Sequence, residues 1–514
     1  MKRKHFFRAL AVAAACALGF NAQAVTKLEG ATANTLQVSE SGAGHFLIVP
    51  YFTTQSGNAL LLSLINMDEV NGKAVKLRFR SARNADTLFD FQVFLAPGDM
   101  WTANVSQNGN GLSYLTTSDA SCSKPAKSVI NATAFQTGRL DQNITAEERA
   151  RETREGYVEI VTMADIPPSA SGMFPLIDLN DGVARCSNLA SNTAWTALDM
   201  NRAGLSDYTA LGMQPPSSGL TANWTIMNVP RALSWSGSAL AIEARSNGKA
   251  ALGHLAVFPQ STASVSSAST YSADPLFAGT SAAVVARMTD LPDISTPYLV
   301  GVSQANQQAA QLADLLAVRT VKNEFWTEPS IDAATDWVFS MPTRRFAVGQ
   351  QYATARTEGR WLVNKQVDRY FVDADAAESW PTSQMSSDPL TFPHGYCQIE
   401  PERSINDRET RYSANPAWSE LLMLHVDFLC NAASVRNVDS PFSNSVGALH
   451  PGTRASLERG VLVANGWMKL DIWGGQGNGI PLVGHAFVRA SNPNATPGVA
   501  GNYSVVWPHR LFKD

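Results

Sequence analysis

The strongest constraint on the fold is a strict alternation of apolar and polar residues that begins at position 75. A period of two is typical of a strand that buries one face and leaves the other in contact with water. The apolar members of the pattern are Val75, Leu77, Phe79, Phe89, Phe91, Val93 and Trp101. We expect this set to share one core, because a slip of one residue would expose all of it. The intervening Lys76, Arg78 and Arg80 are expected to face solvent.

Turn signals divide this region into short strands. Asn71-Gly72 separates the apolar run 59–67 from the strand that starts near Ala74, and this predicts a tight hairpin. Pro97-Gly98-Asp99 marks the next connection. Short strands without crossover helices favour antiparallel pairing in a β-sandwich. We therefore predict a mainly β fold of antiparallel, Ig-like sandwich lobes with loop-rich insertions and a few short helices.

The length of 514 residues allows about two to four domains. We expect a first sandwich lobe over residues 25–290, with insertions at about 107–155 and 167–218, and a helix followed by a second β-rich lobe over 291–514. Thr145 and Glu148 form a capping box that predicts a helix over 146–155, stopped by Gly156. Leucines at helical spacing predict another helix from 304 to about 321. Further strands are predicted at 157–163, 221–229, 239–244, 336–348, 395–399, 420–430, 466–473 and 481–489.

The first 24 residues have the pattern of a secretory signal peptide. A basic start precedes twelve apolar residues at 9–20 and the small-x-small site Ala22-Gln23-Ala24. Twelve residues make about 18 Å of helix, too little for a hydrocarbon core of about 30 Å. Cleavage after Ala24 takes the formal charge from -4 to -8. We expect the protein in the periplasm, on the outer cell surface or outside the cell, without a transmembrane span in the mature chain.

Four cysteines remain after cleavage, and an even count in an oxidising compartment favours disulfides. We predict the pairs Cys122 with Cys186 and Cys397 with Cys430, since each pair lies within one loop-rich region. A zinc site is the alternative. No C-x-x-C or Cys/His pair at ligand spacing supports it.

Charge and motifs exclude several classes of function. The net charge lacks the basic excess of a nucleic-acid binder, so no nucleic-acid partner is expected. No histidine spacing matches a metalloprotease, and G-x-S-x-G is absent. We therefore assign no catalytic or cofactor-binding residue and expect no cofactor. The remaining histidines are expected to be single core or surface residues: His45, His254, His394, His425, His450, His485 and His509.

Two acidic stretches are weak calcium candidates, because calcium takes six to eight oxygen ligands. The first contains Asp373, Asp375 and Glu378; the second contains Asp178, Asn180 and Asp181 before Gly182. Solvated loops are the favoured interpretation of both. Tryptophans beside polar loops could stack on sugars, but core packing is the favoured role for them. These are Trp195, Trp235, Trp380, Trp418 and Trp473.

Several segments resemble a family of uncharacterised, exported proteobacterial cell-envelope proteins. In chain order these are 50–67 (PYFTTQSGNALLLSLINM), 73–105, 155–163 (EGYVEIVTM), 220–229 (LTANWTIMNV), 335–346 (TDWVFSMPTRRF), 479–490 (GIPLVGHAFVRA) and 502–510 (NYSVVWPHR). The resemblance spans nearly the whole mature chain. It implies an exported envelope protein and supplies no catalytic residues.

Two functional hypotheses follow. The favoured one is a structural or adhesive protein without a catalytic centre, which contacts itself, cell-surface components or polysaccharide. The alternative is a secreted hydrolase or carbohydrate-binding protein whose site is assembled only in the fold. Carboxylates gathered with exposed tryptophan in one concave pocket would favour the alternative.

Overall fold

The alternating segment forms two long paired strands, β4 (Gly72–Ser81) and β5 (Thr87–Leu95). They pair antiparallel, with Leu77 opposite Phe91 and Phe79 opposite Phe89. Because opposite residues in such a pair point to the same side, the apolar members form one continuous face. This face is the centre of the fold.

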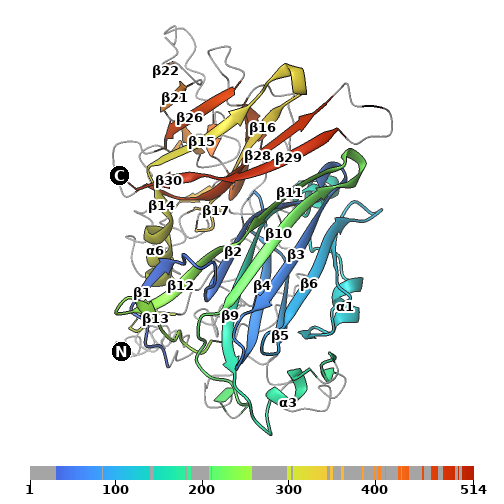
Figure 1. The fold of residues 1–514 in the computed structure, drawn as a ribbon, viewed down its shortest axis with the longest axis vertical. Coiled ribbons are helices and arrows are strands. Elements are labelled where there is room, and N and C mark those ends of the chain that lie inside the picture. The colour runs from blue at the N-terminus through green and yellow to red at the C-terminus, as the bar shows by residue number, and fades with distance from the viewer. Residues whose placement is uncertain are drawn as a thin grey trace, which may run out of the picture.

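Figure 1 shows the computed structural model of the chain. It describes residues 30–83, 85–138, 140, 144–179, 182–186, 208–209, 211–256, 298–301, 305–343, 348–350, 361–363, 385–386, 397–399, 402–406, 411–412, 427–429, 431–438, 454–456, 465–472, 479–492, 496 and 501–513.

Two sheets form the first lobe. The large sheet has eight strands in the order β1 (Thr35–Val38), β12 (Leu240–Ser246), β2 (Phe46–Thr53), β9 (Glu155–Ile166), β4, β5 and β8 (Cys122–Lys124), with β13 (Lys249–Ala250) paired to β12. The β10 sheet has five, in the order β11 (Leu233–Ser238), β10 (Leu220–Asn228), β3 (Asn58–Asn66), β6 (Met100–Gln107) and β7 (Ser113–Thr116).

The two sheets bury a common core. The seven apolar residues predicted from the alternation all belong to it and are at most 5% exposed, which confirms the predicted register. Side chains of the β10 sheet, among them Leu62 and Trp224, complete this core. The opposite face of the large sheet is covered as well, by apolar residues that include Met173, Ile177 and Leu312.

The second lobe contains two more five-stranded sheets. The β15 sheet has the order β22 (Arg411–Tyr412), β21 (Glu402–Asn406), β26 (Asn465–Asp471), β15 (Thr320–Trp326) and β30 (Arg510–Phe512). The β16 sheet has the order β25 (Arg454–Ser456), β24 (Ala433–Asn437), β16 (Ala334–Ser340), β28 (Val483–Ser491) and β29 (Asn502–Pro508). Phe325, Trp337 and Met468 lie in the core between them.

Smaller elements complete the description. Short strands pair as β14 (Ala317–Val318) with β27 (Ile480–Pro481), β17 (Val348–Gln350) with β18 (Trp361–Val363), and β19 (Met385–Ser386) with β20 (Cys397–Ile399) and β23 (Asp427–Leu429). The described helices are α1 (Lys127–Ala132), α2 (Ala146–Glu152), α3 (Phe174–Ile177) and α6 (Ala305–Leu316), with short 3-10 turns at Gln55–Gly57, Val229–Arg231 and Pro329–Ile331. Helix α6 contacts β1 of the first lobe and β27 beside the second (Figure 1).

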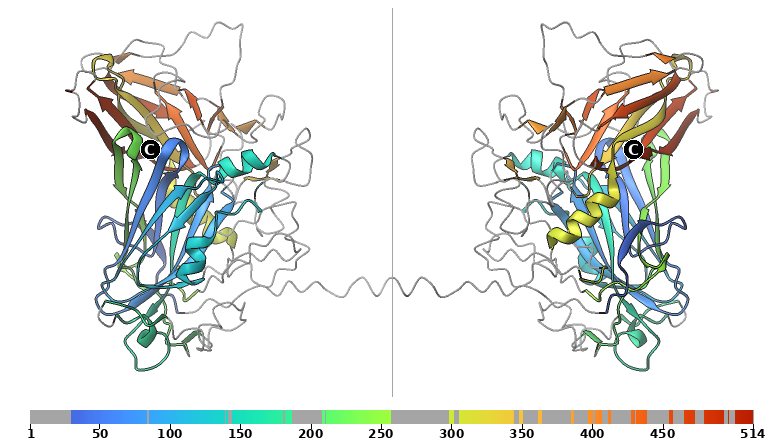
Figure 2. Two further views of the ribbon diagram at one scale, coloured as in Figure 1. Left: turned by 90° about the vertical axis from the view of Figure 1, so that its right-hand side faces the viewer. Right: turned by 90° about the vertical axis from the view of Figure 1, so that its left-hand side faces the viewer.

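The β16 sheet joins the lobes, because its strands are apolar on both faces. Trp337 and Ala486 point into the second-lobe core, whereas Val338 and Phe487 belong to the first-lobe core. Trp235 of β11 donates a hydrogen bond to the carbonyl of Val488 at 2.9 Å. The side views in Figure 2 show the second lobe, in orange and red, directly above the first.

The mainly β, antiparallel prediction is confirmed, with β24 and β25 as a parallel pair. The Ig-like arrangement is not confirmed, since the first lobe has sheets of eight and five strands against about seven to nine in Ig domains. The hairpin predicted at Asn71-Gly72 is wrong. Strands β3 and β4 lie in different sheets, and the link between them is held by Asp68, whose side chain accepts hydrogen bonds from the backbone N–H groups of Val70 and Asn71.

The helix predicted over 146–155 is present with its capping box but ends at Glu152, and β9 begins at Glu155. Gly156 is therefore a strand residue and not a helix stop. A Cβ atom there would lie 1.6 Å from the carbonyl oxygen of Arg80 in β4. The helix predicted from residue 304 is α6, which ends at Leu316, before the position expected from the sequence. Within the described residues, no helix has the length and apolar character needed to cross a bilayer.

Candidate functional site

The polar face of β4 is buried. The prediction that it faces solvent is therefore wrong. Lys76, Arg78 and Arg80 are all 0% exposed. Lys76 pairs with Asp90 of β5, and Arg80 donates to Glu159 of β9 at 2.9 Å. Paired charges of this kind avoid the large cost of an isolated buried ion. The arrangement ties three neighbouring strands together, and we interpret it as structural.

A second buried cluster joins the end of β4 to a loop. The ammonium of Lys73 lies 2.6 Å from Asp165 and 2.8 Å from the hydroxyl of Ser217. Ser217 donates from its hydroxyl to Asp165 at 2.6 Å and lines a groove of about 750 Å³ together with Thr32 and Leu252. A serine beside a lysine is the arrangement of a nucleophile with a general base.

The charges around Lys73 oppose that role. Asp68 lies 3.3 Å from its ammonium, so Lys73 is engaged in ion pairs with two carboxylates as well as in a hydrogen bond with Ser217. Burial raises the pKa of Asp165, although Lys73 partly offsets the effect. Burial also disfavours ionisation of Asp68, but hydrogen bonds from Asn71 and Val70 and the charge of Lys73 lower its pKa to about 2. We interpret the cluster as an anchor that holds the loop at Ser217 to the sheet edge.

The open face of the β10 sheet is a groove whose described lining residues are uncharged. Its volume is about 630 Å³, and its floor lies across β10, β3 and β6. The lining residues carry hydroxyl, amide or apolar side chains: Leu61, Leu62, Ser63, Thr102, Ala103, Asn104, Thr116, Thr117, Ser118, Asn223 and Thr225. The side-chain oxygen of Asn104 is buried there and has no hydrogen-bond partner among the described residues. The floor is rigid, because paired strands carry it and Thr225 hydrogen-bonds across to Ser236 at 2.8 Å.

The open face of the β15 sheet carries a different groove, of about 540 Å³. Trp326 and Trp467 line it together with the carboxylate of Glu324. Glu324 and Trp467 are directly opposite each other on β15 and β26. The structure thus gathers two tryptophans and a carboxylate in one concave place, the arrangement that favours the alternative hypothesis. Of the described lining residues only Glu324 is a carboxylate, whereas glycoside hydrolysis normally uses two, so the groove fits binding better than hydrolysis. Neither tryptophan was singled out from the sequence.

The described histidines are all wholly or partly buried, and two of them contact protein groups as neutral rings. His509 must donate from Nε2 to the carbonyl of Val338 at 3.1 Å, so Nδ1 accepts from Asn323 at 2.8 Å. Burial lowers the pKa of His509 well below its usual value, with a smaller contribution from His485. Burial, followed by the charge of Lys73, lowers the pKa of His45 to about 3.

The remaining histidines fit the expected structural roles where the structure describes them. Burial lowers the pKa of the partly exposed His485 to about 4, and His254 is buried. His394, His425 and His450 lie outside the described residues.

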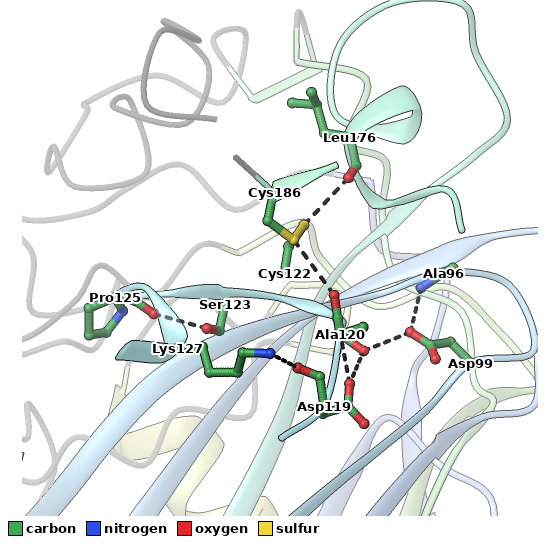
Figure 3. Close-up of a disulfide and its surroundings, with 11 residues drawn as sticks. Ala96, Asp99, Asp119, Ala120, Cys122, Ser123, Pro125, Lys127, Leu176 and Cys186 are labelled. Carbon is green, nitrogen blue, oxygen red and sulfur yellow. Dashed lines mark hydrogen bonds between the residues drawn. A yellow bond between two sulfur atoms is a disulfide. The ribbon is translucent and has the colours of Figure 1, made fainter. Parts of the chain in front are cut away.

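The predicted disulfide between Cys122 and Cys186 is present, with a Cα–Cα distance of 5.3 Å. Figure 3 shows it between β8 and the segment that carries Cys186, close to Leu176. Cys430 lies outside the described residues, so its bond to Cys397 stays a prediction. Strand β20, which begins at Cys397, pairs with β23, which ends at Leu429.

Most other candidate positions are not described. The calcium candidates Asp373, Asp375 and Glu378 lie outside the described residues, as do Asn180 and Asp181. Of the tryptophans singled out, only Trp235 is described, and it packs in the core as predicted. Within the described part of the chain, no three His, Cys, Asp or Glu side chains are grouped as metal ligands require.

Both grooves were missed, although each has a sequence signal. Thr221, Asn223 and Thr225 alternate with buried residues along β10, and Lys322, Glu324 and Trp326 do so along β15. Such alternation identifies which residues face outward. It does not identify which strands are neighbours, and a groove depends on neighbours.

Comparison of the chain with family models, with curated proteins and with solved structures gives no match. The functional argument therefore depends on the geometry of these grooves.

Proposed function

We propose that the protein is exported and acts through surface contacts, without turnover, at the cell envelope or outside the cell. The observation that carries this proposal is the uncharged groove on the β10 sheet. Its hydroxyl and amide groups can exchange bound water for the hydrogen bonds of a hydrated partner, and no ion has to be desolvated. The partner is polysaccharide, another cell-surface component or a second copy of the chain.

The groove also supports binding more directly than catalysis. Among the described residues that line it there is no acid, base or cysteine, and the carboxylate of Asp119 beside it is engaged by the backbone N–H of Thr102. The described lining therefore offers no group that could transfer a proton near neutral pH or become a strong nucleophile. The signal-peptide pattern and the resemblance to exported envelope proteins support the location.

A cell-binding assay tests the proposal. Fluorescently labelled residues 25–514 are sedimented with whole cells of the source organism, and self-association is measured by analytical ultracentrifugation. Because the contacts are uncharged, binding should persist when salt is raised to about 0.5 M. The double variant Thr102→Glu/Asn223→Glu should bind about tenfold more weakly, since it places two exposed charges in the groove.

Thr35→Glu is the matched control, because Thr35 is an exposed strand residue of the large sheet. It should bind as the unchanged protein does. The proposal is overturned if the protein binds neither cells nor itself, or if the double variant binds normally. Saturable hydrolysis of ester, glycoside or peptide substrates that a single serine or carboxylate substitution removes, without a change in melting temperature, would also overturn it.

A further inference from the structure

The groove on the β15 sheet presents an aromatic surface to solvent. Trp467 is 40% exposed, whereas the core tryptophans Trp101, Trp224, Trp235 and Trp337 are at most 1% exposed. A large aromatic side chain in a sheet is usually buried against the adjacent core. Trp467 instead points away from that core, because its neighbour Met468 occupies the buried side of β26.

The surroundings hold this aromatic surface in place. Trp326 lines the same groove and contacts Trp507 edge to face, with ring centroids 5.1 Å apart. Glu324 and Trp467 are cross-strand neighbours in a paired region that extends over seven residues of each strand. The groove is therefore a preformed feature of two paired strands.

The charges of the groove are mostly engaged by the protein itself. Arg510 lies 3.5 Å from the carboxylate of Glu324, and the ammonium of Lys322 lies 4.3 Å from the ring centre of Phe512. Asn465 donates to Glu328 at 3.4 Å. The Glu324 side chain remains 45% exposed, so a ligand can reach it.

These groups select a ligand with an apolar face and a hydroxyl edge. The negative face of an indole ring attracts C–H groups that carry partial positive charge, as one face of a pyranose ring does. A carboxylate accepts hydrogen bonds from two neighbouring hydroxyl groups, and an amide or ammonium donates to others. The two cations of the lining are engaged within the protein, Arg510 by Glu324 and Lys322 by the ring of Phe512, so they do not favour an acidic sugar. A purely apolar ligand would leave the polar groups unpaired.

We propose that this groove binds a neutral polysaccharide, with one pyranose ring stacked on Trp467 and its hydroxyl groups bonded to Glu324 and Asn465. The site lies in the second lobe and shares no residue with the uncharged groove of the first. This proposal does not depend on the function proposed for the uncharged groove, so either proposal can be wrong while the other holds.

Affinity electrophoresis tests the site. The protein is run in native gels that contain dextran, glycogen, a soluble β-glucan or galactomannan, with alginate as the acidic probe. At least one neutral polymer should retard it. Trp467→Ala should weaken that binding about tenfold or more, as loss of a stacked aromatic anchor does. Glu324→Gln should weaken it less, since the amide keeps one acceptor oxygen.

Tyr503→Ala is the matched control, because Tyr503 is an exposed aromatic residue of β29 outside the groove. It should be retarded as strongly as the unchanged protein. Trp467→Phe keeps an aromatic ring and should retain most of the affinity, which separates loss of stacking from loss of folding. Melting temperatures of all variants are measured alongside.

Three results would overturn the proposal. The first is no retardation by any neutral polymer in the panel. The second is equal retardation of the unchanged protein and a folded Trp467→Ala variant. The third is retardation by alginate alone that disappears in salt, which would indicate attraction to Lys322 and Arg510 in place of stacking.

Discussion

Phe91 is the residue on which the alternation argument can be tested most directly. It is 0% exposed, and the centroid of its ring lies 5.5 Å from the ring centroid of Phe89 and 5.6 Å from that of Trp101. Phe91→Ala should lower the free energy of unfolding by about 3 to 5 kcal/mol, because burial is lost and a cavity remains. Urea denaturation measures this change.

Leu61→Ala is the control, since Leu61 is 40% exposed on the open face of the β10 sheet. It should change the free energy of unfolding by no more than about 0.5 kcal/mol. Equal effects of the two substitutions would contradict the register of the sheets.

The buried histidines make stability depend on pH. The pKa of His45 and that of His509 lie below the unfolded value of about 6.5. Below that value the unfolded chain binds more protons than the native one, so stability falls as pH falls. Each such histidine steepens the decline by up to about 1.4 kcal/mol per pH unit.

This prediction is checked by urea denaturation at several pH values between 7.5 and 5.5, with the midpoint of unfolding compared across them. His45→Asn keeps an acceptor for the backbone N–H of Ala244, which donates to His45 at 3.1 Å, but it no longer titrates. In this variant the free energy of unfolding should fall less steeply with decreasing pH, by the contribution of one histidine. An unchanged slope would exclude His45 as a source of the pH dependence.

At the scale of elements, the face of β4 that carries Lys76 and Arg80 explains the main error in the sequence prediction. Alternating charges on a strand usually face water, so the pattern itself could not indicate their burial. Their partners Asp90 and Glu159 come from β5 and β9, and only the sheet order brings them together. The apolar face was predictable because each of its side chains is apolar, so its burial does not depend on a partner from another strand.

The pair of Lys76 and Asp90 provides a test of this buried charge. Asp90→Leu removes one partner of a cation that is 0% exposed, and it should cost about 3 to 5 kcal/mol. The double variant Lys76→Met/Asp90→Leu should recover most of that loss, because an apolar pair needs no desolvation of ions.

Thermal and urea unfolding of the two variants give the comparison. If Asp90→Leu has no effect, the charge of Lys76 does not depend on this pair. If the double variant is as unstable as the single one, the loss of stability comes from altered packing and not from the unpaired charge of Lys76.

Local signals predicted elements better than connections. The capping box of Thr145 and Glu148 was predictable because all of its hydrogen bonds lie within four residues. The hairpin at Asn71-Gly72 was not, because a short link can join strands of two packed sheets as well as strands of one sheet. In this chain Asn66, the last residue of β3, donates from its side chain to the carbonyls of Asn71 and Ala96 and so connects the end of β3 to the link and to the end of β5.

For the whole molecule, the cysteines give the remaining prediction. A non-reduced digest analysed by mass spectrometry should contain the peptide pairs Cys122–Cys186 and Cys397–Cys430. On the chain-entropy model the first bond, with a sequence separation of 64 between its cysteines, contributes up to about 4 kcal/mol. Cys122→Ser/Cys186→Ser should therefore lower the melting temperature.

The same digest distinguishes the alternatives. Peptides that join a cysteine of the first pair to one of the second would contradict the assignment, as would free thiols in freshly purified protein. Loss of the bond without any change in melting temperature would show that the unfolded chain is not constrained by it.

The two-sided β16 sheet has a consequence for how this protein can be divided. A cut between the lobes would expose Phe487 and Val338 on one fragment and Trp224 and Trp235 on the other. Each fragment would then expose an apolar surface, and neither should fold into a stable, monomeric module by itself. Separate expression of the two lobes should therefore give aggregated fragments, whereas co-expression of both should allow the shared core to form.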